Sequence, residues 1–505
     1  MNNKFYITTP IYYVNEKPHV GGAYTTIAAD VLARFHRMKG DQVFFLTGTD
    51  EHGEKIAISA EANHKTPKEW CDENSAKYEE VWDILKISHD NFIRTTDPRH
   101  EKAVVKVLEQ LFEKKLIYTG TYQGLYCIDC ERYYTSKELV DGKCPFHHHE
   151  LVTLSEDCYF FKLSTFQDIL LKLISSNEFL IEPEERKNEI LGFLKSERLE
   201  DLAVSRKKVK WGIEFPLNKE QTIYVWVDAL FNYLSGIDWD GDVKKLPKFW
   251  PPEVQLIGKD ILRFHAVMWP ALLLALELPL PKKLFAHGFF TVNGQKMSKS
   301  LGTGVNPEEL AVTFGADSLR WLLLSLFPFG QDGDLSESRL YDKYNSDLSN
   351  GLGNLVRRVL TLAQDGSEFV PSKIINVEFK EKINSVWQKY EKALDGLHFE
   401  TAIAQINDLI FFCDKYINQE EPWKLSKTNP DKLKDVLYNL LESLRHLSCL
   451  TWPFMPDKSN LILESLGILS QEHTKNLSEI KKFGEGKFEK VSQGQVLFPK
   501  IESVK

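Results

Sequence analysis

The sequence has few cysteines, no excess of positive charge and no long hydrophobic run, and each shortage excludes a class of protein. Seven cysteines among 505 residues are too few and too odd in number for the disulfide scaffold of a secreted protein. A formal net charge of −9 argues against a protein that coats nucleic acid by bulk attraction, although local basic patches could still bind a specific RNA. The composition is otherwise that of an ordinary enzyme.

The most hydrophobic run, residues 266–276, is too short to span a bilayer and is interrupted by Pro270. No apolar signal segment follows Lys4. These absences predict a cytoplasmic protein without a membrane partner. The sequence also has no internal repeat and no low-complexity tract, so we expect about three or four globular domains.

The N-terminal stretch has the pattern of a phosphate-binding unit. Residues 5–7 are typical of a strand, and residues 19–22 (HVGG) open a helix after a polar turn. Backbone N–H groups at the start of a helix bind phosphate, and Gly21 and Gly22 permit a nucleotide to approach closely. A purely structural glycine turn explains this stretch equally well when it is considered alone.

The following residues predict a parallel sheet. Apolar residues recur at helical spacing through residues 23–35, Gly40 stands where a C-terminal cap belongs, and residues 43–46 are typical of the next strand. Such a βαβ unit binds ligands at the carboxyl ends of its strands. Asp50, within residues 48–53 (GTDEHG), lies at such an end and could meet a cation or an amine, or could cap the next helix.

Two Cys/His pairs interrupt the α/β pattern. Cys127 and Cys130 form the first pair, and Cys144 and His147 form the second. The two-residue gap within each pair lets a turn aim both side chains at one ion, which predicts a structural tetrahedral Zn²⁺ site. Two further histidines adjoin His147, so the identity of the fourth ligand stays open. We expect the zinc to stabilise an inserted lobe and to take no part in chemistry.

Strand patterns return at residues 223–227, 254–257 and 286–292. Two half-sheets divided by an insert can frame a pocket between them. The loop at residues 296–300 (KMSKS) follows, and its two lysines suit the triphosphate of ATP, because charge that builds on departing pyrophosphate needs cations. An unremarkable exposed lysine loop is the alternative for this motif alone.

The C-terminal third predicts an antiparallel helix bundle. Its apolar residues recur at helical spacing, and most are expected to be core; the four segments are residues 348–362, 383–394, 403–410 and 436–447. The basic run at residues 206–210 is expected to be a solvated face, with RNA contact as the alternative.

In combination, residues 19–22 and 296–300 resemble the paired signatures of class I aminoacyl-tRNA synthetases, although the first signature usually ends in histidine where this chain has Gly22. Further segments and the single zinc knuckle narrow the resemblance to the methionyl-tRNA synthetase family. These segments are residues 8–15 (TTPIYYVN), 48–53 (GTDEHG), 224–229 (YVWVDA) and 258–261 (GKDI).

The resemblance covers essentially the whole chain and implies an α/β fold. A Rossmann-type parallel sheet is split by a zinc-binding connective peptide and is followed by a stem-contact region and an all-α anticodon-binding bundle. The expected bounds are 1–116 and 223–270 for the two Rossmann halves, 117–222 for the connective peptide, 271–345 for the stem-contact region with the KMSKS loop, and 346–505 for the bundle.

The implied reaction activates L-methionine with ATP and Mg²⁺ to methionyl adenylate and transfers the methionyl group to tRNA(Met). The resemblance makes His19, Lys296 and Lys299 the catalytic residues, which position and stabilise the phosphates. Because Gly22 lacks an imidazole, another group must compensate or activation is slower. The implied ATP-binding residues are His19, Gly21, Gly22, Gly258, Asp260, Lys296, Ser298 and Lys299.

The resemblance also implies a methionine pocket in which Asp50 takes the α-amino group and apolar walls suit the polarizable thioether. Such a pocket discriminates one methylene by only about 1 to 3 kcal/mol, so near-cognate amino acids could be activated. Trp226 and Tyr233 could equally be core. The implied residues are Ile11, Tyr13, Asp50, Trp226, Ala229, Tyr233, Ile261 and His265.

In the bundle, Asn354 and Arg358 lie four residues apart on one helical face, and Trp423 is expected in a loop. By resemblance these are the anticodon readers: Trp423 stacks a base, and the polar pair bonds base edges. A capped helix end with a core tryptophan is the alternative.

Two other functions compete with this interpretation. A class I ligase for another amino acid, such as cysteine, could bind a thiol substrate through zinc, but the four zinc ligands form a closed set. A non-catalytic RNA-binding or nucleotide-sensing relative is disfavoured because both loop lysines are present. No appended tRNA-binding domain follows the bundle, so we expect a monomer.

Overall fold

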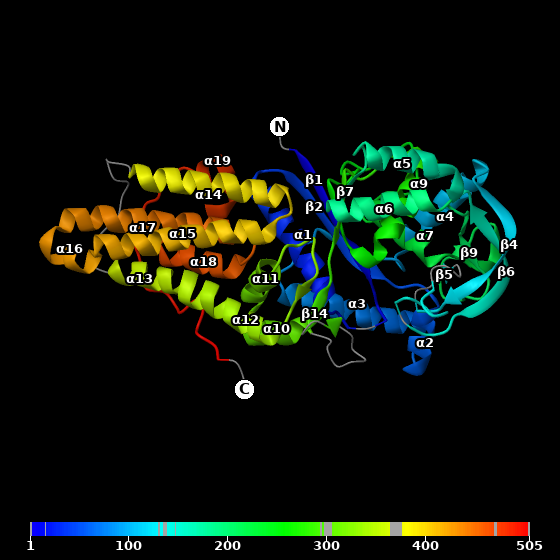
Figure 1. Cartoon of the computed structure of the whole chain (residues 1–505), viewed down its shortest axis with the longest axis horizontal. Coiled ribbons are helices and arrows are strands. Elements are labelled where there is room, and N and C mark those ends of the chain that lie inside the picture. The colour runs from blue at the N-terminus through cyan, green and yellow to red at the C-terminus, as the bar shows by residue number, and fades with distance from the viewer. Residues whose placement is uncertain are drawn as a thin grey trace.

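The structure is a computed structural model of an elongated molecule, with an α/β body at one end and a helix bundle at the other (Figure 1). No helix in the described part of the chain is both long and apolar enough to cross a membrane. The described residues are 3–15, 17–129, 132–134, 139–146, 148–292, 295–296, 306–363, 376–468 and 472–502.

A six-stranded parallel sheet forms the centre of the body, in the order β3-β2-β1-β12-β13-β7. Its inner strands are mostly buried because helices cover both faces, and the buried residues include polar ones such as Thr8, Thr47 and Gln255. The strands are β1 (Lys4–Tyr13), β2 (Gln42–Asp50), β3 (Asn91–Arg94), β7 (Leu180–Glu182), β12 (Val254–Gly258) and β13 (Lys283–His287).

Helix α1 (Val20–Met38) follows β1 and lies between the body and the bundle (Figure 1). It begins at the predicted place, because His19 caps it by accepting a hydrogen bond from the backbone N–H of Gly21. Gly40 follows the helix end with a φ of 83°, the left-handed conformation that favours glycine. The predicted strand–helix–strand unit is thus confirmed. Helices α2 (Glu54–Ala62), α3 (Pro67–Ile84) and α4 (Pro98–Glu113) complete the first half of the body.

One predicted strand is wrong. Residues 223–227 were expected to form a buried strand, but β11 (Asn218–Ile223) ends there and helix α7 (Val225–Leu230) begins, followed by α8 (Asn232–Ser235). A short apolar run is buried in either conformation, so periodicity alone does not distinguish a strand from a core helix. Strand β11 instead pairs with β9 (Ser205–Arg206) and β10 (Glu214–Phe215) in a small sheet.

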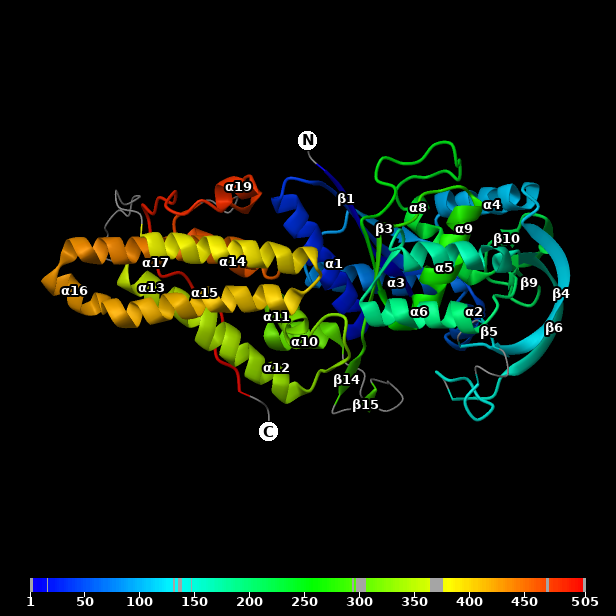
Figure 2. The same cartoon turned by 45° about the horizontal axis from the view of Figure 1, so that its top comes forward.

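The segment expected to be one insert, residues 117–222, contributes to two different structures. Its long strands β4 (Ile117–Cys127) and β6 (Val152–Phe161) form a curved antiparallel arm at the far end of the body, with β5 (Arg132–Tyr134) and β8 (Leu202–Ala203) at its edges (Figure 2). Helices α5 (Gln167–Ser175) and α6 (Glu184–Ser196) flank β7, which is the edge strand of the central sheet. Buried Ile181 holds β7 there.

A second small sheet follows the body, in the order β15-β14-β16. It consists of β14 (Phe290–Val292), β15 (Gln295–Lys296) and β16 (Gly333–Asp334). Before it in the chain, η4 (Phe264–Met268) and α9 (Trp269–Ala275) pack in the body. After β15 come helices α10 (Pro307–Phe314) and α11 (Ala316–Ser325), and α12 (Glu337–Lys343) follows β16.

The C-terminal third is the predicted helix bundle. A π-helical segment (Tyr344–Gly353) leads into α13, and the four apolar segments found in the sequence all fall in helices with buried apolar faces. The helices are α13 (Asn354–Leu362), α14 (Val377–Asp395), α15 (Phe399–Glu420), α16 (Pro422–Thr428), α17 (Pro430–Thr451), α18 (Pro456–Ser465) and α19 (Leu477–Ile480).

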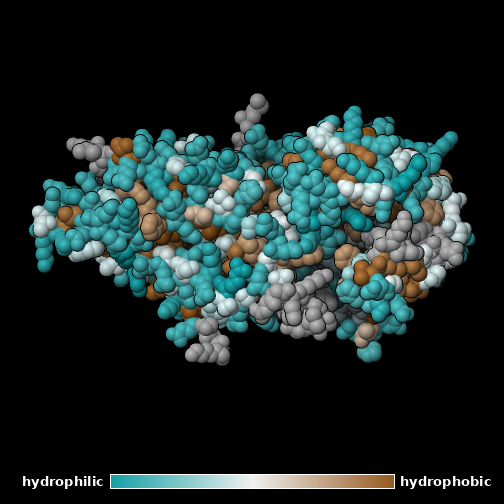
Figure 3. Space-filling view, in the orientation of Figure 1, coloured by the Kyte–Doolittle hydropathy of each residue, from teal (hydrophilic) through white to brown (hydrophobic). Residues whose placement is uncertain are grey.

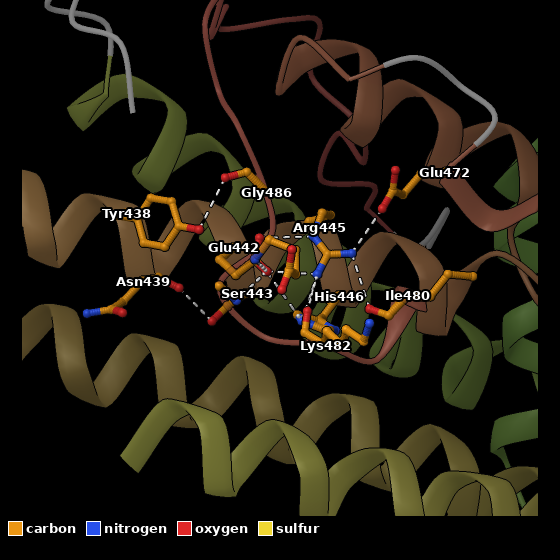
Figure 4. A network of polar contacts seen from close by, with 12 residues as sticks. Tyr438, Asn439, Glu442, Ser443, Arg445, His446, Glu472, Ile480, Lys482 and Gly486 are labelled. Atoms are coloured by element: carbon orange, nitrogen blue, oxygen red, sulfur yellow. Dashed lines mark hydrogen bonds and ion pairs between the residues drawn. The ribbon is translucent and has the colours of Figure 1, made fainter. Parts of the chain in front are cut away.

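A buried charge network ties the C-terminal segment to the bundle (Figure 4). On α17, Arg445 makes two hydrogen bonds to Glu442, at 2.9 and 2.7 Å, and a third to Glu472, at 3.0 Å. Arg445 also donates to the backbone carbonyls of Ile480 and Lys482. The network therefore fixes the chain after α18 against α17.

Arg320 on α11 joins the body to the bundle. Its fully buried guanidinium pairs with Asp30 of α1 at 2.6 Å and donates to the carbonyl of Leu85 in the body. It also donates to the carbonyls of Pro453 and Phe454 in the bundle, at 2.7 and 2.8 Å. A single side chain thus contacts both the body and the bundle where they meet.

Candidate active site and RNA-binding surface

The candidate active site lies where the parallel strands of the central sheet end, because their carboxyl ends meet at one edge. Tyr13 ends β1, Asp50 ends β2, and the two residues are register partners in the sheet. Gly258 ends the neighbouring strand β12, and His19 caps the helix that leaves this edge. The structure therefore brings together residues that the sequence predicted for the methionine and ATP sites.

The signature at residues 19–22 forms the start of α1. His19 Nδ1 accepts a hydrogen bond of 3.1 Å from the Gly21 N–H, which orients the imidazole at the helix N-terminus. A Cβ atom at Gly22 would lie 3.1 Å from the ring of Tyr12. The Tyr12 hydroxyl bonds to the Gly22 carbonyl at 3.1 Å and to Thr26 Oγ1 at 2.6 Å. The glycine thus fits against a fixed aromatic ring.

The KMSKS loop is attached to the body by a hairpin. Lys296 pairs with Thr291 across β14 and β15, whereas Ser298 and Lys299 lie outside the described residues. Asp332, which precedes strand β16 beside β14, accepts two hydrogen bonds from the Lys259 ammonium, at 2.6 and 2.8 Å. Asp332 also accepts a hydrogen bond of 2.7 Å from the Phe289 N–H.

This anchor escaped the sequence analysis, although Lys259 lies between the predicted ATP residues Gly258 and Asp260. Lys259 is on the turn after β12, and Asp332 precedes β16. The pair therefore connects the predicted nucleotide side of the site to the base of the loop hairpin. The position of Lys259 inside the motif GKDI is the one sequence signal that could have indicated it. The residues around Asp332 in the sequence give no such signal.

Four of the residues predicted for the methionine side chain, Tyr233, His265, Ile261 and Trp226, lie close together. Tyr233 Oη lies 2.7 Å from His265 Nε2, and His265 Nδ1 donates to the Ile261 carbonyl at 3.0 Å. Burial lowers the pKa of His265 to about 4, so this imidazole is neutral near pH 7. Trp226 stacks on Phe264 with ring centroids 3.7 Å apart. A neutral, aromatic group of this kind suits an uncharged thioether.

The segment around Asp50 is held by its neighbours. Glu51 is fully buried and receives both Arg94 Nε and Nη2, at 2.6 and 2.9 Å. Thr96 donates a further hydrogen bond of 2.5 Å to Glu51 Oε2. Trp211 Nε1 donates to the Glu51 carbonyl. Rigid support of this kind presents the carboxylate of Asp50 at a defined position.

The basic run at residues 206–210 has two environments. Lys207, Lys208 and Lys210 are exposed, as expected for a solvated face. Arg206 is buried instead, with its guanidinium 3.9 Å from the centre of the Tyr224 ring. The expectation of a fully solvated run is therefore wrong at Arg206, because a planar cation stacks well on an aromatic face.

The residues predicted to bind zinc are described only in part, because Cys130 and His147 lie outside the described residues. Cys127 and Cys144 are buried together in one small cluster with Tyr134. His149 Nε2 lies 4.0 Å from Cys127 Sγ and also contacts the carboxylate of Asp129. Two buried thiols beside an imidazole fit a soft divalent metal.

The predicted anticodon residues lie on the bundle. Arg358 on α13 pairs with Asp414 of α15 at 2.7 Å and donates to Asn418 at 3.1 Å. Asn354 begins the same helix. Trp423 was expected in a loop, but this expectation is wrong: it lies near the start of helix α16. The left-handed conformation of Glu421 lets α16 begin directly after α15.

Trp423 is 48% exposed, which is inconsistent with a place in the core. Hydrophilic side chains dominate the bundle end of the face seen in Figure 3. An exposed tryptophan in such surroundings is a suitable stacking platform for an RNA base.

The sequence matches two family models. One, described as tRNA synthetases class I (M), covers residues 5–158 and 148–360. The other, described as the anticodon binding domain of methionyl tRNA ligase, covers residues 372–505.

Curated relatives match almost the whole chain. A methionine–tRNA ligase of Caldanaerobacter subterraneus subsp. tengcongensis is 44% identical over 99% of this chain and 80% of its own length. Those of Bacillus subtilis and Streptomyces coelicolor are 42% and 40% identical over 99% of this chain, and the match covers 78% and 97% of their lengths.

Solved structures match as well. Mycobacterium tuberculosis methionyl-tRNA synthetase in complex with methionyl-adenylate superimposes with a TM-score of 0.93 at 35% identity, over 98% of this chain and 100% of that chain. Its apo form gives a TM-score of 0.87 at 32% identity, over 100% and 99%.

Proposed function

The chain belongs to the methionyl-tRNA synthetases of class I, and from this premise we propose which of its residues ligate L-methionine to tRNA(Met) with ATP. The methionine carboxylate attacks the α-phosphate of ATP and releases pyrophosphate. The terminal ribose hydroxyl of tRNA then attacks the methionyl carbonyl and releases AMP. One observation carries the proposal: Tyr13 and Asp50 end paired strands at the carboxyl edge of the sheet, and His19 caps the helix that follows β1, in a chain that matches this family throughout.

In the activation step, His19 and the start of α1 bind the phosphates of ATP, which enters with Mg²⁺. Lys296 and Lys299 close over the departing pyrophosphate. The Lys259–Asp332 pair supports this assignment, because it anchors the hairpin that carries the loop. The remaining residues assigned to ATP are Gly21, Gly22, Gly258, Asp260 and Ser298.

Methionine binds with its ammonium on Asp50 and its thioether against the neutral Tyr233–His265 pair. The low pKa of His265 supports this assignment, because a charged imidazole would disfavour an apolar side chain. Trp226 provides an aromatic wall. The other residues assigned to the pocket are Ile11, Tyr13, Ala229 and Ile261.

The anticodon of tRNA binds on the bundle at Asn354, Arg358 and Trp423. The contacts of Arg358 with Asp414 and Asn418 support this assignment, because they hold the guanidinium in one orientation at the surface. The exposure of Trp423 supports a stacking role.

Zinc binds Cys127, Cys130, Cys144 and His147, with His149 as the alternative fourth ligand. When bound, the metal supplies a structural cross-link and no chemistry. Metal analysis of purified protein should find one zinc per chain, and His147→Ala or His149→Ala should lower that content according to which imidazole is the ligand. A zinc-free protein of full activity would contradict the assignment.

We also propose that the chain acts in the cytoplasm as a monomer and that its functional divisions are residues 1–116, 117–222, 223–270, 271–345 and 346–505. The buried thiols support a reducing compartment. Size-exclusion chromatography with light scattering tests the oligomeric state.

ATP–pyrophosphate exchange with a panel of amino acids tests the function directly. Methionine should support exchange far better than cysteine, leucine or valine, and the chain should then acylate tRNA(Met). Exchange supported by another amino acid would contradict the methionine assignment. Exchange without acylation would contradict the second step alone.

A further inference from the structure

A fully buried cluster of one carboxylate and two imidazoles lies behind the candidate methionine pocket. Asp228 Oδ2 accepts a hydrogen bond of 2.7 Å from His52 Nδ1, and Asp228 Oδ1 accepts one of 2.7 Å from His100 Nε2. The far nitrogen of His100 lies 2.7 Å from Ser235 Oγ. The three side chains at the centre are at most 4% exposed.

These residues come from the elements that carry the predicted pocket. His52 follows Asp50 by two residues in the segment after β2. Asp228 lies on α7 between Trp226 and Ala229, and Ser235 lies on α8 two residues after Tyr233. His100 on α4 contacts Asp228 from a third element. The cluster therefore joins the ammonium side of the pocket to its apolar wall.

The cluster is charged. Burial alone would favour the neutral imidazole of His52, but the charge of Asp228 and its hydrogen bond raise the pKa of His52 above its ordinary value. Burial alone would likewise raise the pKa of Asp228, but the charge of His52 and the two imidazole hydrogen bonds lower it. A buried ion pair holds its partners strictly because separation would leave an uncompensated charge.

Other charged groups also face His52. Glu101 of α4 lies 4.0 Å from His52 Nε2, and Glu51 lies on the same segment as His52. The Trp211 ring meets His52 edge-on, with the ring centroids 5.5 Å apart. Glu101 is partly exposed, and its pKa is raised, chiefly by burial. Asp228, at 2.7 Å against 4.0 Å for Glu101, is the closer carboxylate to His52.

We propose that His52, Asp228 and His100 are positioning residues that fix the distance between Asp50 and the Trp226 wall, and thereby set the length of amino acid that the site activates. The inference rests on the proposed function of the pocket. None of the three residues is assigned a contact with the substrate. His52 and Asp228 act through Asp50, Trp226 and Ala229, their neighbours along the chain, and His100 acts through Asp228.

The test measures ATP–pyrophosphate exchange with methionine and with ethionine, which is one methylene longer. Asp228→Asn replaces one of the two acceptor oxygens by an NH2 group, so one imidazole N–H loses its acceptor and both imidazoles lose the anionic charge. The methionine KM should therefore rise on the order of 10-fold or more, and the ATP KM should change by less than about 2-fold. The kcat/KM preference for methionine over ethionine, about 10- to 200-fold for one methylene in a rigid pocket, should narrow.

The pH dependence supplies a second measurement. Because the pKa of His52 is raised, the imidazole keeps its charge to a higher pH than an ordinary histidine and loses it as the pH rises through the raised value. The methionine KM of the wild type should therefore increase over that range. His52→Gln should lack this step. The titration of the substrate amine is common to both proteins and cancels in the ratio of their KM values.

The bundle offers a matched control. His446 is equally buried and accepts a hydrogen bond of 3.0 Å from Trp387 Nε1, far from the pocket. His446→Gln should lower the melting temperature and leave the methionine KM and the ethionine ratio unchanged. Ser235→Ala, which removes only the contact on the far nitrogen of His100, should shift both quantities in the direction of Asp228→Asn by a smaller factor.

Three outcomes would overturn the positioning role. Equal rises in the methionine and ATP KM values, an unchanged ethionine ratio in both Asp228→Asn and Ser235→Ala, or the same pH step in His52→Gln would each make the cluster purely structural. If Asp228→Asn does not fold, Ser235→Ala and His52→Gln decide the matter. Failure of the wild type to show methionine-dependent exchange would instead contradict the proposed function.

Discussion

The body and the bundle each bury a network of carboxylates and basic side chains, and the two networks differ in the distances along the chain that they span. In the bundle, Arg445 and Glu442 lie three residues apart on one helix. In the body, His52 and Asp228 are 176 residues apart. The bundle network stabilises one helix and the segment packed on it, whereas the body network fixes two separate elements of a candidate site. Buried charge is thus informative about function only when the elements it joins are considered.

The strongest test of this contrast separates chemistry in the body from recognition on the bundle. Lys299→Ala should lower the rate of adenylate formation about 100- to 1,000-fold, because a cation is lost where charge develops on pyrophosphate. Pyrophosphate exchange measures this effect. Binding of tRNA(Met) in a filter assay should stay within about 2-fold of wild type, since the anticodon surface lies at the other end of the molecule. Exchange at the wild-type rate would contradict the role of the loop.

The bundle network should affect stability alone. Arg445→Met leaves Glu442 buried without its cation and should lower the free energy of unfolding by about 3 to 5 kcal/mol, as measured by urea denaturation. The methionine KM should not change. An unchanged free energy of unfolding in Arg445→Met would show that the network contributes little to stability.

The same network has a defined pH dependence. Burial alone would raise the pKa of Glu442, but hydrogen bonds from His446 and Arg445 and the charge of Arg445 lower it well below its ordinary value. Its stabilising contribution is therefore present above the unfolded-state pKa of about 4.3 and is lost as the pH falls below that value. In Glu442→Gln this part of the acid sensitivity should be absent from melting curves.

Recognition on the bundle should be separable from both kinds of network. Trp423→Ala should weaken tRNA(Met) acylation by about 1 to 3 kcal/mol of lost base stacking, measured as a higher KM for tRNA. Pyrophosphate exchange should be unchanged. Trp423→Phe is the matched control, because it keeps an aromatic ring and should retain most of the wild-type acylation efficiency. Equal damage to both reactions would indicate misfolding.

The smallest effect is expected at Gly22. Gly22→His restores the imidazole of the usual signature, but a Cβ atom there would meet the Tyr12 ring at 3.1 Å, so the ring must shift by a few tenths of an ångström. We expect an increase in the exchange rate of up to about 10-fold, less than a well-placed donor supplies. Gly22→Ala imposes the same steric demand without the imidazole. A rate below wild type in both variants would show that steric fit dominates.

Much of the fold was predictable from local patterns. The bundle helices and the start of α1 at His19 depend on periodicity and on residues that lie within a few positions of each other. The failures came where local pattern was ambiguous. The apolar run before Ala229 forms a helix, and Trp423 follows a left-handed residue that begins a new helix instead of a loop.

The candidate site was predictable only where its residues lie in motifs. Asp50 and Trp226 were predicted because they lie in stretches whose residue types and order resemble a family, and His265 was predicted because the resemblance extends along the chain beyond those stretches. The partners that hold these residues were not found. Lys259 meets Asp332 and His52 meets Asp228 across long chain separations, and a single sequence holds no local signal for such pairs.

The sequence by itself determined the helical bundle, the strand–turn–helix start of the body and the residue types at the ends of the strands, because these depend on neighbours along the chain. The tertiary structure decided that β7 completes the central sheet, that residues after 224 form a helix, and that Asp228 meets two imidazoles. These features depend on which distant elements pack together, and burial then determines the charges and hydrogen bonds that those elements must share.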